Sequence, residues 1–124
     1  MNKLLAIMIG GAIGAVLRYF VSTGSAKLFG SSFPWGTLAV NTAGCLMIGV
    51  AFGIAQTRGM DEHVRLFFVT GFLGALTTFS TFSFETIEHA RQGAMLVSLT
   101  NVLANNVLGI SAAYLGYWGV IRTL

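Results

Sequence analysis

The chain alternates between four long apolar stretches and three short connections that carry most of its charged residues. A helix needs about 20 mainly apolar residues to cross the hydrocarbon core of a membrane, and each stretch is close to that length. The only proline, Pro34, follows Ser31 and Ser32, which are suited to cap the second helix. The pattern predicts an all-α membrane protein with four transmembrane helices in one domain, residues 1–124, with spans at about residues 4–22, 35–57, 66–86 and 95–121.

The composition excludes several classes of protein. Hydrophobic residues make up 55% of the chain and charged residues 9%, against about 25% charged in an average soluble domain. So few charges would leave a soluble domain of this size with large exposed apolar patches. The net charge of +3 comes from scattered basic residues, so we expect no nucleic-acid partner. No nucleophile–base pair, phosphate-binding loop or zinc-ligand spacing is present in the sequence, so we expect no enzyme activity.

Basic residues give little indication of which side of the membrane is cytoplasmic. Four fall on the side that holds both chain ends, and three fall on the other, where Arg18 is counted near the end of the first span. Orientation normally follows an excess of Lys and Arg in short cytoplasmic loops. The near balance favours a chain that inserts in both orientations and pairs antiparallel. A fixed orientation set by the first span is the alternative.

Glycines lie mostly inside the spans rather than between them. Gly10 and Gly14 form one pair at four-residue spacing, and Gly49 and Gly53 form another. Such pairs let helix backbones approach closely in lipid. The helices that meet there belong either to one chain or to two copies of it.

The densest polar cluster lies in the third span, where five of the seven residues 77–83 carry hydroxyl groups: Thr77, Thr78, Ser80, Thr81 and Ser83. Ser and Thr side chains compete for backbone hydrogen bonds, and Gly71 and Gly74 precede them. We therefore predict a break near the middle of the third helix. Irregular backbone at this depth is tolerated only where protein or an aqueous cavity covers it, and freed carbonyl groups there suit a hard cation such as sodium. A regular helix whose hydroxyls bond their own turn is the alternative.

Other polar groups in the spans are candidates to extend this cluster. Asn41 lies in the uncharged second span, and the fourth span contains Asn101, Asn105, Asn106, Ser111 and Tyr114. Taken singly, each is expected to bond between helices, whereas together they suit a polar track.

Aromatic and charged residues flank the hydroxyl cluster. Phe79 and Phe82 are three residues apart, so they share a helix face, and the positive edges of their rings can attract an anion. Glu85 follows the cluster and is expected at one mouth of the track, with a helix-end ion pair to His89. Arg18 either extends to the membrane interface or gathers anions at a vestibule.

Three runs of residues resemble one known family. Residues 71–83, Gly-Phe-Leu-Gly-Ala-Leu-Thr-Thr-Phe-Ser-Thr-Phe-Ser, resemble the signature of the bacterial Fluc/CrcB fluoride channels, as do residues 14–19 and 34–41. The resemblance covers nearly the whole chain. It implies a passive fluoride-selective channel in the bacterial inner membrane that exports fluoride and so confers fluoride resistance. It also implies a dual-topology, antiparallel homodimer in membrane lipid, with two pores.

The resemblance further implies roles for individual residues. The fluoride pathway would be lined by Asn41, Phe79, Ser80, Thr81, Phe82, Ser83 and Tyr114. Arg18 would lie at a vestibule and Glu85 at a pore mouth. A structural sodium ion at the dimer interface would be held by the backbone carbonyl groups of Gly74 and Thr77 from both subunits, and no organic cofactor is implied.

Two other functions also suit a small four-helix membrane protein. One is a proton-coupled exporter of small ions or drugs, although small dual-topology exporters depend on an acid in the first helix and residues 4–22 contain none. The other is a non-conducting membrane assembly subunit, which would give no ion flux as a pure protein.

Overall fold

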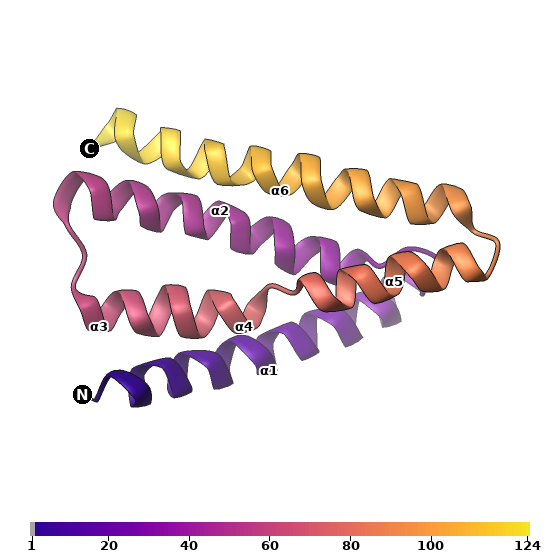
Figure 1. The fold of residues 1–124 in the computed structure, drawn as a ribbon, viewed down its shortest axis with the longest axis horizontal. Coiled ribbons are helices and arrows are strands. Elements are labelled where there is room, and N and C mark those ends of the chain that lie inside the picture. Colours follow the sequence, from indigo (N-terminus) through magenta and orange to yellow (C-terminus); the bar gives the residue numbers. More distant parts are fainter. Residues whose placement is uncertain (1) are drawn as a thin grey trace.

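A computed structural model describes residues 2–124 as a bundle of helices (Figure 1). Three spans are continuous helices: α1 (Lys3–Phe29), α2 (Trp35–Arg58) and α6 (Met95–Thr123). The third is assembled from α3 (Glu62–Arg65), the π-helix η1 (Leu66–Leu73), α4 (Gly74–Leu76) and α5 (Phe79–Arg91). All four are long and apolar enough to cross a membrane, which confirms the predicted all-helical, four-span architecture and a multi-pass membrane protein.

Glycines with positive φ, rather than the fading of hydrophobicity, set the ends of these helices. Gly30, Gly59 and Gly93 have φ of 76°, 77° and 80° and end or follow α1, α2 and α5. Glycine adopts this backbone conformation without steric cost. The first span therefore continues to Phe29, beyond the predicted residue 22.

The start of α2 differs from the prediction. Pro34, and not a serine, occupies the cap position, and no side chain there accepts a hydrogen bond from the helix. The predicted serine cap is therefore wrong. The first turn of α2 is instead held by the Pro34 carbonyl oxygen, which accepts from the Leu38 amide at 3.2 Å.

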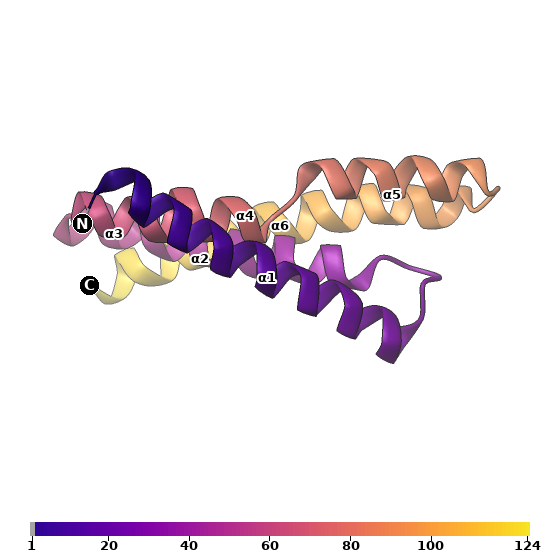
Figure 2. The same ribbon diagram turned by 90° about the horizontal axis from the view of Figure 1, so that it is seen from below.

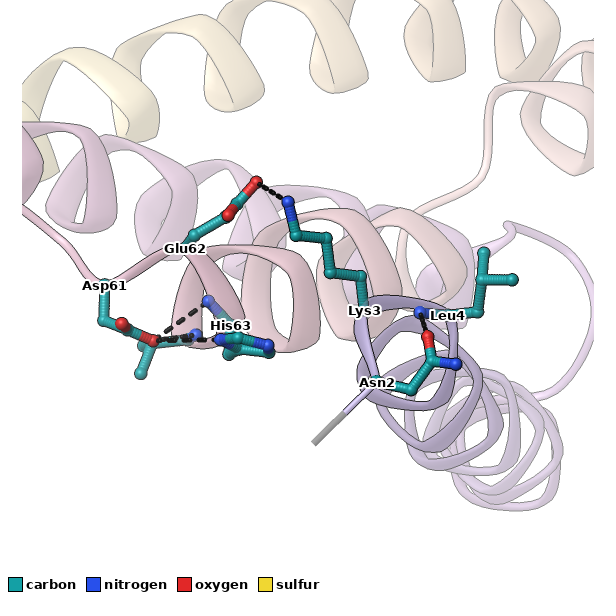
Figure 3. Close-up of polar contacts among 7 residues, drawn as sticks. Asn2, Lys3, Leu4, Asp61, Glu62 and His63 are labelled. Atoms are coloured by element: carbon teal, nitrogen blue, oxygen red, sulfur yellow. Dashed lines mark hydrogen bonds and ion pairs between the residues drawn. The ribbon is translucent and has the colours of Figure 1, made fainter.

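Side-chain caps and one ion pair hold together the end of the bundle where both termini lie (Figure 3). The Asn2 side chain accepts from the Leu4 amide at 2.9 Å and caps α1. The Asp61 carboxylate caps α3 by accepting from the His63 amide at 2.9 Å. Lys3 Nζ lies 2.8 Å from Glu62 Oε1, and this exposed ion pair joins α1 to α3.

Glycines let the helices pack backbone to backbone. A Cβ atom on Gly14 would overlap the carbonyl oxygen of Phe72, and one on Gly49 would overlap that of Ala113. The first contact joins α1 to the third span, and the second joins α2 to α6. Both glycine pairs therefore serve packing within one chain, which was one of the two predicted alternatives.

The third span changes its neighbour halfway along its length. The part made of α3, η1 and α4 lies along α1, whereas α5 lies along α6, and the connection between α4 and α5 crosses from one to the other (Figures 1 and 2). Irregular backbone is thereby placed in the interior of the bundle, among α1, α2 and α6.

Candidate functional site

The third helix is broken at Thr77 and Thr78, which confirms the predicted break. Thr77 has ψ of 155° and Thr78 has φ of −149° and ψ of 118°, so both are extended. Helix α5 restarts directly afterwards, because the Thr78 hydroxyl oxygen caps it by accepting from the Thr81 amide at 3.1 Å. Part of the hydroxyl cluster therefore serves to end one helix and begin the next.

Asn41, on α2, closes the break with its side-chain amide. Its Oδ1 accepts from the Thr78 amide at 2.8 Å, and its Nδ2 donates to the Thr78 carbonyl oxygen at 3.1 Å. In a continuous helix the Thr78 amide would bond Gly74 O, and the Thr81 amide would bond Thr77 O. Because both amides bond side chains instead, the carbonyl groups of Gly74 and Thr77 lose their helical donors.

Arg18 lies beside the same break. Its Nε donates to the carbonyl oxygen of Ala75 at 2.9 Å, and its side chain is half-buried. The sequence placed Arg18 near the end of the first helix, and this placement is wrong because α1 continues to Phe29. The guanidinium therefore satisfies a carbonyl group that the break releases.

A cavity of about 410 Å³ opens against the break and collects polar and aromatic side chains from four elements. Its walls come from α2, the third span on both sides of the break, and α6. The predicted site residues that line it are Asn41, Gly74, Thr77, Phe79 and Phe82. The lining residues do not include Ser80, Thr81, Ser83 or Tyr114.

The two cavity phenylalanines are held very differently. Phe82 is 6% exposed and packs inside the bundle, whereas Phe79 is 79% exposed. Their ring centroids lie 5.4 Å apart with an interplanar angle of 56°. The pair therefore presents one fixed ring and one outward ring at the start of α5.

A second cavity, of about 210 Å³, lies toward the α1–α2 connection and is lined in part by Glu85, Thr37 and His89. Thr37 Oγ1 donates to Glu85 Oε1 at 2.8 Å. His89 Nδ1 donates to the backbone carbonyl oxygen of Glu85 at 2.7 Å, so this contact replaces the predicted ion pair. Thr37 and Asn41 are one helical turn apart on α2, so the two cavities adjoin along that helix.

Two contributors to this region were not singled out in the sequence. Thr37 is 2% exposed and contacts Glu85. Thr86 Oγ1 accepts from Asn101 Nδ2 at 3.0 Å. Their sequence signal is spacing: Thr37 lies four residues before Asn41 and shares its helix face.

Comparison with known proteins places the chain among relatives of similar length. The family described as CrcB-like protein, Camphor Resistance (CrcB), matches residues 5–117. Proteins named fluoride-specific ion channel FluC are similar throughout: that of Shewanella denitrificans is 47% identical, that of Shewanella amazonensis 46% and that of Shewanella loihica 44%. Each match extends over 116 residues, 94% of this chain and 94% of the relative.

Proposed function

The chain belongs to the CrcB family, and we propose that it is a fluoride channel whose ions pass along the face shared by α2, α5 and α6. The family is one of ion channels, so the chain is not an enzyme. The observation that carries the proposed route is the broken third helix, closed by Asn41 and opening onto the cavity of about 410 Å³. Such irregular backbone inside a membrane protein is expected to line a pathway.

Fluoride is small and strongly hydrated, so a pore must replace much of its water shell. Compact donors suit this task, and the route offers the Asn41 amide together with the hydroxyls of Ser80, Thr81 and Ser83. The edges of Phe79 and Phe82 add weak attraction. Conduction also requires that the ion is held loosely enough to leave, and neutral donors meet that requirement better than a buried cation would.

Glu85 and Thr37 are proposed to mark one mouth of this route. They line the second cavity, which adjoins the first along α2 and α5. Arg18 is proposed to act from the break, where its charge raises the local potential for an anion. Tyr114 is 63% exposed on α6 and is proposed to join the pathway only in the assembled protein.

A second copy of the chain is proposed to cover the open side of the break. Phe79, Gly74 and Ser80 are exposed there, and lipid does not tolerate an uncovered irregular backbone at this depth. A break in the middle of the span lies at the same depth in either orientation, so an antiparallel copy would bring two breaks together. This supports an antiparallel homodimer in membrane lipid.

Dual topology is tested by biasing the charge. Because Arg18 lies inside the bundle, four basic residues remain at the end with the termini and two, Lys27 and Arg91, at the other. Adding three lysines at the chain ends should force one orientation and abolish activity. Adding them at the opposite turns should act alike, and mixing the two variants should restore activity. Full activity with every chain in one orientation would contradict dual topology.

A structural sodium ion between the two breaks is a further part of the proposal. Two carbonyl oxygens per chain, Gly74 O and Thr77 O, have lost their helical donors because Thr78 and Thr81 bond elsewhere. Neutral oxygens from two copies suit a hard cation, and bound sodium would offset their dipoles. Purification with a bulky organic cation in place of sodium should weaken the dimer, and unchanged dimer stability would count against the site.

Passive conduction, fluoride export and resistance, and a bacterial inner-membrane location complete the proposal. The comparisons do not favour the exporter or the assembly subunit. Fluoride efflux from liposomes, measured with and without a pH gradient, separates the candidates. A passive channel follows the fluoride gradient alone, whereas a proton-coupled exporter responds to the pH gradient and an assembly subunit gives no flux.

A further inference from the structure

Asn101, on α6, is the largest side chain that the structure buries completely, with an exposed fraction of 0%. A buried amide inside a membrane protein is costly unless its polar atoms are paired. Asn101 Nδ2 donates to Thr86 Oγ1 at 3.0 Å, and Asn101 Oδ1 accepts from Asn105 Nδ2 at 2.9 Å. The amide therefore connects α5 to the next turn of its own helix.

The connection continues to the break. Asn105 Oδ1 accepts from Asn41 Nδ2 at 2.9 Å, so Thr86, Asn101, Asn105 and Asn41 form one relay of side chains. Ser98, 5% exposed, also ties Thr86 to α6, because its Oγ donates to the Thr86 carbonyl oxygen at 2.8 Å.

The relay has one direction, fixed from the α5 end. The Thr86 hydroxyl lies 2.8 Å from the Phe82 carbonyl oxygen, which can only accept, so the hydroxyl donates there. Its oxygen is then left to accept from Asn101. Asn101 must turn its oxygen toward Asn105, which must in turn present its own oxygen to Asn41.

The break fixes the same direction from the other end. The Thr78 amide can only donate, so Asn41 must face it with Oδ1. Asn41 Nδ2 is then left to donate to Thr78 O and Asn105 Oδ1. Both ends of the relay therefore specify one orientation for every amide in it.

We propose that Thr86 and Asn101 are positioning residues that hold Asn105, and through it Asn41, in the orientation that closes the break and supplies the donor of the fluoride pathway. This inference rests on the proposed function. Neither Thr86 nor Asn101 lines the large cavity, so they act on the ion only through Asn105 and Asn41. A passing fluoride would accept the Asn41 hydrogen that Asn105 accepts at rest.

The test compares three substitutions of threonine in the full-length protein in liposomes. Thr86→Val removes the hydroxyl with little change in volume and should lower both the fluoride rate and the fluoride-to-chloride ratio by about five- to tenfold, the size of one lost hydrogen bond. Thr86→Ser keeps the hydroxyl and should restore both. Thr57→Val is the matched control, because Thr57 Oγ1 makes the same bond to a carbonyl four residues earlier, Gly53 O at 2.8 Å, outside the relay.

A second readout follows the position of the amide itself. The side-chain ¹⁵N resonance of Asn41 in bilayers should move in Thr86→Val and stay in place in Thr57→Val. If wild-type protein conducts fluoride and Thr86→Val keeps its rate, ratio and Asn41 resonance, the inference is wrong. If wild-type protein gives no fluoride flux, the proposed function fails instead.

Folding of the variants is also decisive. Thr86→Ala places a smaller side chain at the same site and repeats the comparison if Thr86→Val does not fold. If neither folds while Thr86→Ser does, the hydroxyl serves stability, and the positioning role is overturned.

Discussion

The side chain of Asn41 bonds both backbone polar groups of Thr78, the amide at 2.8 Å and the carbonyl oxygen at 3.1 Å. A side chain on α2 thus satisfies backbone groups that the third span cannot satisfy itself. The break and Asn41 depend on each other, because an unpaired peptide group at this depth would cost several kcal/mol.

Substitutions of Asn41 should separate its structural role from its donor role. Asn41→Leu leaves both Thr78 groups unpaired, so it should lower the free energy of unfolding by about 1–3 kcal/mol and abolish fluoride flux. Asn41→Asp keeps an oxygen for the Thr78 amide but removes the donor, so it should retain more stability and still lose flux.

Thermal unfolding in detergent and liposome efflux measure the two effects. Asn106→Leu is the stability control, because Asn106 Nδ2 bonds the Val102 carbonyl oxygen of its own helix at 2.8 Å. Wild-type flux in Asn41→Asp would contradict a donor role for this residue.

The two cavity phenylalanines should differ in stability but not in function. Phe79→Ile and Phe82→Ile should each sharply reduce fluoride flux with the assembly intact, because both remove a ring edge from the route. Only Phe82→Ile, at a position 6% exposed, should also cost about 1–2 kcal/mol of folding free energy. Efflux, gel filtration and melting temperature test this, and unchanged flux in either variant would remove that ring from the pathway.

Glycine substitutions test the packing of α1. A Cβ atom on Gly14 would overlap the Phe72 carbonyl oxygen, whereas one on Gly24 would meet no atom within 4 Å. Gly14→Ala should therefore destabilise the fold by about 1–3 kcal/mol. Gly24→Ala should be neutral or stabilising, since alanine favours a helix by up to about 1 kcal/mol. Equal melting temperatures for the two variants would contradict this packing.

Arg18 offers a choice between charge and geometry. Arg18→Lys keeps the positive charge but loses the planar donor that reaches Ala75 O at 2.9 Å. If that bond supports the break, both Arg18→Lys and Arg18→Gln should unfold at lower temperature than wild type. Wild-type stability and flux in Arg18→Lys, with loss of flux in Arg18→Gln, would assign its role to charge alone.

The sequence predicted those features that local patterns determine. Apolar stretches of membrane length predicted the spans, and the density of Ser and Thr after Gly74 predicted the break, because both arise from neighbouring residues. The ends of the helices were less accessible. They depend on the backbone φ of glycines such as Gly30, and that error displaced Arg18 from the interior to a helix end.

Contacts between distant residues were beyond local patterns. Asn41 and Thr78 are 37 residues apart, and their pairing requires α2 to lie against the break. The same holds for Thr37 with Glu85 and for Thr86 with Asn101, whose partners are set by how the helices pack. Fourth-span asparagines were noticed as polar residues in lipid, but their order in a hydrogen-bonded relay follows only from the packed bundle.

Fluoride efflux from liposomes that contain only the purified protein tests the central claim most directly, with chloride efflux from matched liposomes as the control. A fluoride-selective channel predicts rapid fluoride release down its gradient and no chloride release above that of protein-free vesicles. Fluoride release no faster than from protein-free vesicles, or equal release of both anions, would contradict the account.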